Sequence, residues 1–549
     1  MKLTGAQIII ETLASLGVDT VFGYPGGTVL DIYDALYFSS NRITHILTAH
    51  EQGAAHAADG YARVSGKPGV VIATSGPGAA NLVTGIANAY LDSVPMIAIT
   101  GNVSVPLLGR DSFQEVDIIG ITMPIVKHSF IVRDAAELER TLREAFAIAN
   151  NGRRGPVLID VPKSVQCDKA EYIGAVGVKP ATARPLPDIS AAVEAICHCT
   201  RPYLYFGGGI IAADAERESI AVAELLNAPI GLSMMGLGAI PYDHPLNLGM
   251  CGMHGRYAST VAQSKADLII AAGVRFSDRA TGDIDKYTRN CKIIHIDIDA
   301  AELGKNVRPE ISLCGDVKQI LSALLDTLPG KYNPDWLAEI DALKSSVPIG
   351  AADTFTPQNI IRAIHARISP DSIIATDVGQ HQMWVAQSYP FTKPRTFLSS
   401  GGLGAMGFGL GAAIGGCIAA GRKRTVHFTS DGSFGMNLNE LSTAVSQHLP
   451  ILTIILNNGA LGMVRQMQTI FYDSRYSQTV IDRRTDFVKL AEAFGARGYR
   501  AESLNELSAV LDSLDDESVP IVIDCRIDSD LMVMPMIPSG GGIEDIIVS

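Results

Sequence analysis

Short apolar runs recur along this chain, and segments with a helical pattern separate them. The runs occupy residues 69–74, 95–100, 156–160, 267–271, 292–296, 372–376, 425–431, 451–458 and 520–524. Strands that are apolar on both faces belong in parallel sheets covered by helices. The repeated alternation therefore predicts an α/β fold built from doubly wound parallel sheets. With 549 residues, the chain is too long for a single core.

Two segments without a periodic apolar pattern divide these repeats. Residues 178–188 hold three prolines, and residues 328–357 are polar and broken. Such composition marks linkers between domains. We expect three domains, at residues 1–180, 188–335 and 355–549.

The composition is that of a globular protein, and the formal net charge is −13. No cluster of Lys and Arg offers a footprint for phosphates, so we expect no nucleic-acid partner. Residues 68–91 and 396–421 carry no charge and are long enough to span a membrane. Their many Gly, Ser and Asn residues instead favour buried loop–helix segments around a cofactor, and we expect no membrane segment.

The eight cysteines form no Cys-x-x-Cys pair. A strand through Cys197, His198 and Cys199 would place both thiols on one side, as a metal site requires. Residues 190–200 have a helical pattern, however, which favours a plain helix. The cysteine usage and the absence of a signal-like apolar run at the start predict a reducing, cytoplasmic compartment.

Two polar strand ends form the most informative pair in the sequence. Asp431 ends one apolar run and Asn458 ends the next. Neighbouring parallel strands would bring these ends together, and their oxygens suit a Mg²⁺ ion that holds a diphosphate. Their spacing matches the thiamine diphosphate motif, although Ser430 stands where that motif usually has Gly.

The first third of the chain holds a second candidate for chemistry. Glu51 lies among Gly and Ala residues, where desolvation raises the pKa of a carboxyl group and lets it share a proton with a heterocycle. A surface Glu at the start of a helix is the simpler alternative. The glycines of residues 75–81 let the backbone approach a ligand, although plain turns have the same composition.

Several motifs together resemble the catalytic subunit of acetohydroxyacid synthase (acetolactate synthase), over essentially the whole chain. They are residues 24–27 (YPGG), 50–53 (HEQG), 74–78 (TSGPG), 113–115 (FQE), 252–255 (GMHG), 278–279 (DR), 376–384 (TDVGQHQMW), 400–409 (SGGLGAMGFG), 461–466 (LGMVRQ) and 534–538 (MPMIP). The resemblance implies pyrimidine-binding, central FAD-binding and diphosphate-binding domains. It also implies that two pyruvates form 2-acetolactate, or that pyruvate and 2-ketobutyrate form 2-aceto-2-hydroxybutyrate, in branched-chain amino-acid synthesis.

The same resemblance implies cofactors, partners and residue roles. Thiamine diphosphate, Mg²⁺ and FAD would bind, in a homodimer or tetramer with active sites at subunit interfaces and with a possible regulatory small subunit. Glu51 would protonate the pyrimidine, Met406 would support the bent cofactor, and Arg279 would bind the acceptor carboxylate, although an ordinary surface ion pair is the alternative for Arg279. The remaining substrate-pocket residues are Gly27, Phe113, Gln114, Lys163, Met253 and Met467. Mg²⁺ would bind Asp431, Asn458 and the Ala460 carbonyl. The other thiamine diphosphate contacts are Gln380, His381, Gly404, Gly432, Ser433, Leu461, Gly462 and Met463. The FAD candidates are Arg153, Gly207, Gly208, Gly209, Gly236, Gly255, Arg275, Asp297 and Asp316.

Six positions depart from the family pattern: Thr28, Ser104, Ser277, Gly411, Ser430 and Met467. Met467 replaces a Trp that shapes the acceptor pocket, so we expect weak preference for 2-ketobutyrate. Met467, Thr28 and Ser104 together also predict low sensitivity to sulfonylurea-type inhibitors. If residue 430 needs positive φ, Ser430 is strained and lowers cofactor affinity.

Two other functions stay open from the sequence. Another thiamine diphosphate-dependent 2-ketoacid decarboxylase or oxidase has the same architecture, but it needs no acceptor-carboxylate site. A paralogue that has drifted and lost activity would explain the departures. Glu51, Asp431 and Asn458 argue against that second alternative.

Overall fold

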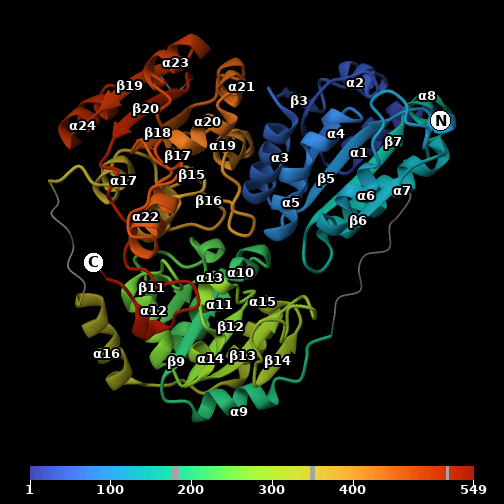
Figure 1. Ribbon diagram of the computed structural model, residues 1–549. Coiled ribbons are helices and arrows are strands. Elements are labelled where there is room, and N and C mark those ends of the chain that lie inside the picture. The colour runs from blue at the N-terminus through green and yellow to red at the C-terminus, as the bar shows by residue number, and fades with distance from the viewer. Residues whose placement is uncertain (175–184, 347–352, 515–517, 549) are drawn as a thin grey trace.

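Three parallel sheets, one per domain, organise the chain in a computed structural model that describes residues 1–174, 185–346, 353–514 and 518–548. Figure 1 shows the N-terminal and C-terminal domains side by side, with the central domain beneath them. Helices cover both faces of each sheet, which is the doubly wound arrangement that the sequence predicts.

The N-terminal sheet has the strand order β3-β2-β4-β5-β7-β6, and all neighbouring strands are parallel. Its strands are β2 (Thr20–Tyr24), β3 (Thr44–Leu47), β4 (Gly69–Ala73), β5 (Met96–Asn102), β6 (His128–Ile131) and β7 (Pro156–Pro162). The helices are α1 (Gly5–Ser15), α2 (Leu30–Tyr37), α3 (Glu51–Ser65), α4 (Pro77–Asn81), α5 (Val83–Leu91), α6 (Ile118–Thr122), α7 (Leu138–Asn150) and α8 (Lys163–Cys167). A short antiparallel pair joins β1 (Lys2–Thr4) to β8 (Lys169–Glu171).

The central sheet has the order β11-β10-β9-β12-β13-β14 and is also parallel. Its strands are β9 (Pro202–Phe206), β10 (Ile230–Leu232), β11 (Asn247–Met250), β12 (Leu268–Ala272), β13 (Lys292–Asp297) and β14 (Ile311–Cys314). The helices are α9 (Ser190–His198), α10 (Gly208–Ala212), α11 (Glu216–Leu226), α12 (Tyr257–Lys265), α13 (Asp278–Thr281), α14 (Ile284–Thr288), α15 (Val317–Thr327) and α16 (Pro334–Ser345).

The C-terminal sheet has the order β16-β15-β17-β18-β20-β19, again with parallel neighbours. Its strands are β15 (Ile373–Thr376), β16 (Phe397–Leu398), β17 (Thr425–Thr429), β18 (Ile451–Asn457), β19 (Arg497–Ala501) and β20 (Ile521–Arg526). The helices are α17 (Pro357–His365), α18 (Gln380–Ser388), α19 (Phe408–Ala419), α20 (Asp431–Asn437), α21 (Glu440–Ser446), α22 (Gly462–Phe471), α23 (Phe487–Phe494) and α24 (Leu504–Asp512).

Two helices join the N-terminal and C-terminal domains through very close packing. α3 and α19 lie against each other, and one buried cluster contains side chains from both domains. A Cβ atom at Gly60 or Gly415 would overlap the backbone of the facing helix, at Ala412 and Ala57 respectively. Glycine and alanine therefore set the separation of the two helices, which explains the uncharged, small-residue composition of α19.

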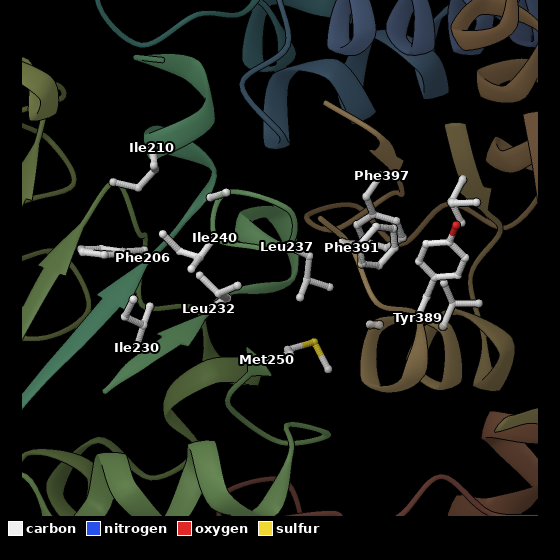
Figure 2. Packing of buried hydrophobic residues seen from close by; sticks show 14 of the residues in the cluster. Phe206, Ile210, Ile230, Leu232, Leu237, Ile240, Met250, Tyr389, Phe391 and Phe397 are labelled. Atoms are coloured by element: carbon white, nitrogen blue, oxygen red, sulfur yellow. The ribbon is translucent and has the colours of Figure 1, made fainter. Parts of the chain in front are cut away.

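A second buried cluster joins the central and C-terminal domains. Figure 2 shows Leu237 and Met250 of the central domain facing Tyr389, Phe391 and Phe397 of the C-terminal domain. All five side chains are buried. Apolar contacts thus fix the central domain against its neighbour.

Each apolar run that we predicted as a strand coincides with a strand of these sheets. Residues 190–198 are helical, as predicted for the Cys197–Cys199 segment. None of the helices in the described part of the chain combines the length and apolar character that crossing a bilayer requires.

The second predicted linker differs from the structure. Residues 334–345 form α16 instead of a broken segment, because Trp336 and Ile340 share one helix face and pack into a buried cluster of the central domain. Parts of both predicted linkers, residues 178–184 and 347–352, lie outside the described residues. We propose that the central domain extends to Ser345, and the other domain bounds stay proposals.

Candidate active site

The two polar strand ends lie next to each other, as predicted. β17 and β18 are parallel neighbours, and Thr429 pairs with Ile455 just before the ends. One detail differs from the prediction: β17 ends at Thr429, and Asp431 is the first residue of α20. The carboxylate is therefore held at a helix start, directly beside the segment that follows β18.

Asp431 and Asn458 suit a hard metal ion. The Oδ1 atom of Asp431 is buried and has no hydrogen-bond partner among the described residues. Burial raises the pKa of this carboxyl group to about 6. Asn458 Oδ1 accepts from the backbone N–H of Ala460 at 3.2 Å. A carboxylate oxygen without a partner next to an amide oxygen fits Mg²⁺, because a bound cation would compensate the buried charge.

Ser430 is not strained, which removes the reason given for lower cofactor affinity. Its φ is −123°, an ordinary extended conformation, and its hydroxyl accepts from the N–H of Ser433 at 3.3 Å. Ser430 thus caps the N-terminus of α20, which is a preferred role for serine. Lower cofactor affinity was predicted only if residue 430 needed positive φ, and the observed backbone does not meet that condition.

A small cavity of about 80 Å³ lies beside these strand ends, lined by residues of the C-terminal domain. The residues that we predicted and that line it are Gln380, His381, Met406, Asn458, Ala460, Leu461, Gly462 and Met463. Gly432 lies close by, since a Cβ on it would approach Leu461 and Met406, and Ser433 donates to the Val378 carbonyl at 3.0 Å. Gly404 has a φ of +71° and does not line this cavity.

His381 and Gln380 supply neutral polar groups to the cavity. Burial lowers the pKa of His381 to about 4, so its imidazole is neutral at pH 7. Its Nε2 atom is buried and lacks a hydrogen-bond partner in the described part of the chain. Gln380 donates to Gln466 at 3.0 Å and to the Leu531 carbonyl at 2.8 Å, and it accepts from Asn458 at 3.3 Å. His381 Nε2 is therefore available to an anionic group next to the metal position, whereas both amide hydrogens of Gln380 are engaged within the described chain.

Trp384 also lines this cavity, and we did not select it from the sequence. Its side chain is 2% exposed, and its indole N–H has no partner among the described residues. Trp384 lies one helical turn after Gln380 on α18. That i, i+4 spacing was the available signal.

Glu51 lies at the start of α3, in the N-terminal domain. Asn81 donates to its Oε2 atom at 3.0 Å, and a Cβ on Gly78 would lie 3.2 Å from its Oε1 atom. The structure therefore brings the predicted Glu51 and the glycine-rich loop together. Asn81 is a further contact that the sequence analysis did not single out.

Other predicted pocket residues of the N-terminal domain lie near the same loops. Lys163 donates to the carbonyl of Gly27 at 3.1 Å. Gln114 has a φ of +59°, and a Cβ on Gly76 would lie 2.7 Å from its carbonyl oxygen. Phe113 is 88% exposed, which is unusual for a large apolar side chain.

Two predicted substrate contacts belong to the central domain. Arg279 Nη1 lies 3.4 Å from the sulfur of Met253. The Arg279 side chain is 66% exposed and has Asp278 at 3.6 Å as its ion-pair partner.

Met467 belongs to the C-terminal domain and is half-buried on α22. Within one chain, the cavity beside Asn458 is thus lined by the C-terminal domain, while Glu51 is held by N-terminal residues.

A larger cleft of about 460 Å³ lies where the three domains meet. The FAD candidates that line it are Arg153, Gly208, Gly209, Arg275, Asp297 and Asp316, whereas Gly207, Gly236 and Gly255 do not. Gly209 lets its turn pack onto the turn at Gly273, because a Cβ would lie 2.5 Å from the Gly273 Cα. Arg153 pairs with Glu302 at 2.6 Å at the rim.

Comparisons with known proteins identify the family. Three domain descriptions match: "Thiamine pyrophosphate enzyme, N-terminal TPP binding domain" at residues 3–121, the central domain at 189–324 and the C-terminal TPP binding domain at 377–525. The acetolactate synthase large subunit of Corynebacterium glutamicum is 44% identical over 99% of this chain and 90% of its own length. Acetolactate synthase isozyme 3 large subunit of Escherichia coli is 41% identical over 100% and 99%. The chain belongs to the acetolactate synthase large-subunit family.

A protein of Methanocaldococcus jannaschii named probable acetolactate synthase large subunit is 44% identical over 99% of this chain and 95% of its own length. The two candidate half-sites fall within the matched thiamine pyrophosphate-binding domains. Glu51 and Asn81 lie in the N-terminal one, and Asp431 and Asn458 lie in the C-terminal one. These domains support thiamine diphosphate as the cofactor.

Proposed function

We propose that this protein is an acetolactate synthase, which condenses two pyruvates to 2-acetolactate with loss of carbon dioxide. Pyruvate and 2-ketobutyrate would give 2-aceto-2-hydroxybutyrate in the same site. Membership of the acetolactate synthase large-subunit family over 99% of the chain is the observation that carries this proposal.

The C-terminal half-site would hold the cofactor by its diphosphate. Asp431, Asn458 and the Ala460 carbonyl would bind Mg²⁺, which neutralises the diphosphate and the buried Asp431 carboxylate. The unpartnered Nε2 atom of His381 would contact the phosphate oxygens, and the amide of Gln380 would do so by exchanging its bond to Gln466 or to Leu531. When bound, thiamine diphosphate supplies the electron sink for decarboxylation and carbon–carbon bond formation.

Glu51 would move the proton that activates the cofactor. Its Oε2 atom is held by Asn81, while Oε1 lies over Gly78, so the carboxyl group is oriented but not fully occupied. A positioned carboxyl group of this kind can share a proton with a ring nitrogen.

We also propose that two chains build each site, as a homodimer or a tetramer. Glu51 is absent from the residues that line the cavity beside Asn458 in the described chain. The same two domains contact each other through α3 and α19. A second chain would bring the N-terminal half-site over the C-terminal half-site of its partner.

The acceptor's carboxylate would bind Arg279, whose planar guanidinium is largely exposed beside Met253. Gly27, Phe113, Gln114, Lys163 and Met467 would complete the pocket. FAD would bind in the three-domain cleft, where Gly208 and Gly209 allow close approach of the ligand and Arg153 supplies a cation. A regulatory small subunit and a cytoplasmic location complete the proposal.

The test is to incubate the purified chain with pyruvate, thiamine diphosphate, Mg²⁺ and FAD, and to measure acetolactate after acid conversion to acetoin. We expect acetoin only after the acid step. Acetaldehyde or acetate as the main product would instead favour the second candidate, a 2-ketoacid decarboxylase or oxidase. The exposed guanidinium of Arg279 argues against that candidate, because those reactions need no acceptor carboxylate.

A further inference from the structure

A third cavity, of about 570 Å³, opens beside the ends of β17, β18 and β20. Four arginines line it: Arg483, Arg484, Arg500 and Arg526. Asp431 and Asn457 form part of its wall, whereas Gln380 and His381 do not. The cavity therefore adjoins the candidate metal site but is separate from the diphosphate contacts.

A buried carboxylate orients two of these arginines. The Asp524 side chain is 0% exposed, and its Oδ2 atom accepts from Arg526 Nε at 3.0 Å and lies 3.5 Å from Arg500 Nε. Its other oxygen accepts from Asn457 at 2.8 Å. Because Asp524 engages Arg526 through Nε, both terminal amino groups of Arg526 keep no partner among the described residues.

The other two arginines are also available. Arg483 and Arg484 are exposed, and neither has an ion pair or hydrogen bond within residues 353–514 or the rest of the described chain. Arg483 lies over α20, where a Cβ on Gly435 would lie 3.4 Å from its Nη1 atom. A Cβ at that distance would only be in ordinary contact, so the Arg483 guanidinium lies against the surface of α20.

The acidic groups around the cavity are largely committed to other contacts. Asp524 is buried beneath Arg500 and Arg526. Asp486 caps α23 by accepting from the N–H groups of Val488 and Lys489, and it also contacts Arg500 at 3.3 Å. Asp431 belongs to the candidate metal site. Arg500 and Arg526 are thus balanced by Asp486 and Asp524, and Arg483 and Arg484 are the guanidinium groups left for an incoming anion, with Asp482 beside them.

We propose that this cavity binds a phosphate-bearing small molecule. Guanidinium groups bind phosphate through paired, charge-assisted hydrogen bonds, and a tetrahedral phosphate can accept from several sides. The arginines come from β19, from the end of β20 and from the segment before α23, so they approach from different elements. The volume lies in the range of small-molecule sites, roughly 300–1,000 Å³.

The test measures binding of inorganic phosphate without pyruvate, so its result does not depend on acetolactate formation. The whole protein is first saturated with thiamine diphosphate and Mg²⁺, which fills the diphosphate site. Phosphate is then titrated at constant ionic strength, and binding is followed by isothermal calorimetry. We expect saturable binding, which weakens at least tenfold in the double variant Arg483→Ser/Arg484→Ser.

Two further variants make the result specific. Arg217→Ser/Arg289→Ser removes two exposed arginines of the central domain that have no ion pair within the described residues, and this variant should bind phosphate like the unmodified protein. Arg526→Lys keeps the charge but loses the fork held by Asp524, so it should weaken binding several-fold. No saturable binding to the unmodified protein, or equal weakening in both double variants, would overturn the proposal.

Discussion

The N-terminal and C-terminal domains carry the same sheet with different chemistry at its edge. Counted along the chain, both sheets place their strands in the order second, first, third, fourth, sixth, fifth. After the third strand, one domain has a glycine-rich loop and the other has Ser430 and Asp431. After the fourth strand, only the C-terminal domain has a metal-binding type of residue, Asn458. The fold is shared, and function follows from a few residues at strand ends.

A buried carboxylate in the sixth strand makes this comparison sharper. Asp160 in β7 accepts from Asn102 at 2.5 Å and from Thr100 at 2.7 Å. Asp524 in β20 occupies the corresponding register and accepts from Asn457 at 2.8 Å. Asp160 has neutral partners, whereas Asp524 also holds Arg500 and Arg526. In the N-terminal sheet this carboxylate–amide pair thus bonds only to neutral groups of the neighbouring strand. In the C-terminal sheet the same pair also orients two guanidinium groups.

The largest expected effect separates proton transfer from cofactor binding. In Glu51→Gln, acetolactate formation should fall by about 10²–10⁴-fold, because a positioned general acid–base group is lost. The affinity for thiamine diphosphate should change little, since the diphosphate contacts lie in the other domain. Glu144→Gln, an exposed change on α7, is the matched control. Unchanged acetolactate formation in Glu51→Gln would contradict the assigned role.

The next effect should appear in cofactor affinity. Asp431→Asn removes the charge that faces the proposed Mg²⁺, so half-saturation by Mg²⁺ and thiamine diphosphate should rise by about 100-fold, which corresponds to about 3 kcal/mol. Binding is measured by quenching of the fluorescence of Trp384, which lines the cofactor cavity.

The control for Asp431→Asn is Asp528→Asn, an exposed carboxylate after β20, which should bind the cofactor normally. The other tryptophan, Trp336, lies in the central domain and gives a constant background. Equal affinities for both variants would remove Asp431 from the metal site.

A smaller effect concerns stability in the N-terminal domain. Burial raises the pKa of Asp160 to about 6 from 3.8. The Asp160 carboxyl group therefore binds its proton more tightly in the folded state than in the unfolded state. As pH rises from about 4 to about 6, the contribution of Asp160 to the free energy of unfolding decreases. In Asp160→Asn, the loss of unfolding free energy over this pH range should be smaller by up to about 3 kcal/mol. Urea unfolding at pH 4.5 and 7 measures it.

The matched control for that experiment is Asp34→Asn, an exposed change on α2 that should leave the pH dependence intact. If Asp160→Asn and the unmodified protein lose equal stability over this pH range, the carboxyl group does not hold the extra proton.

The smallest expected effect concerns the acceptor pocket. Met467→Trp should raise preference for 2-ketobutyrate over pyruvate by about tenfold, because a rigid wall adds about 1–3 kcal/mol of apolar selectivity. It should also increase sensitivity to sulfonylurea-type inhibitors. Competition between the two acceptors, with product analysis, provides the measurement. A strong 2-ketobutyrate bias in the unmodified protein would contradict the role given to Met467.

Periodicity predicted the strands well, because residues buried on both faces must all be apolar. Residues 334–345 were predicted as a broken segment, although Trp336, Ile340 and Leu343 have the i, i+4, i+7 spacing that indicates a helix. The sequence left open whether residue 430 needs positive φ. Only the backbone shows that Ser430 is extended and caps α20.

The sequence by itself determined the α/β class, the family and the identity of the polar residues at the strand ends. These follow from local patterns and from chemistry that few residue types provide. The tertiary structure decided which groups meet. It separated Glu51 from the cavity beside Asn458, and it placed Arg500 on Asp524 through pairing of β19 and β20. Such contacts join residues distant in the chain, so they depend on sheet register and domain packing.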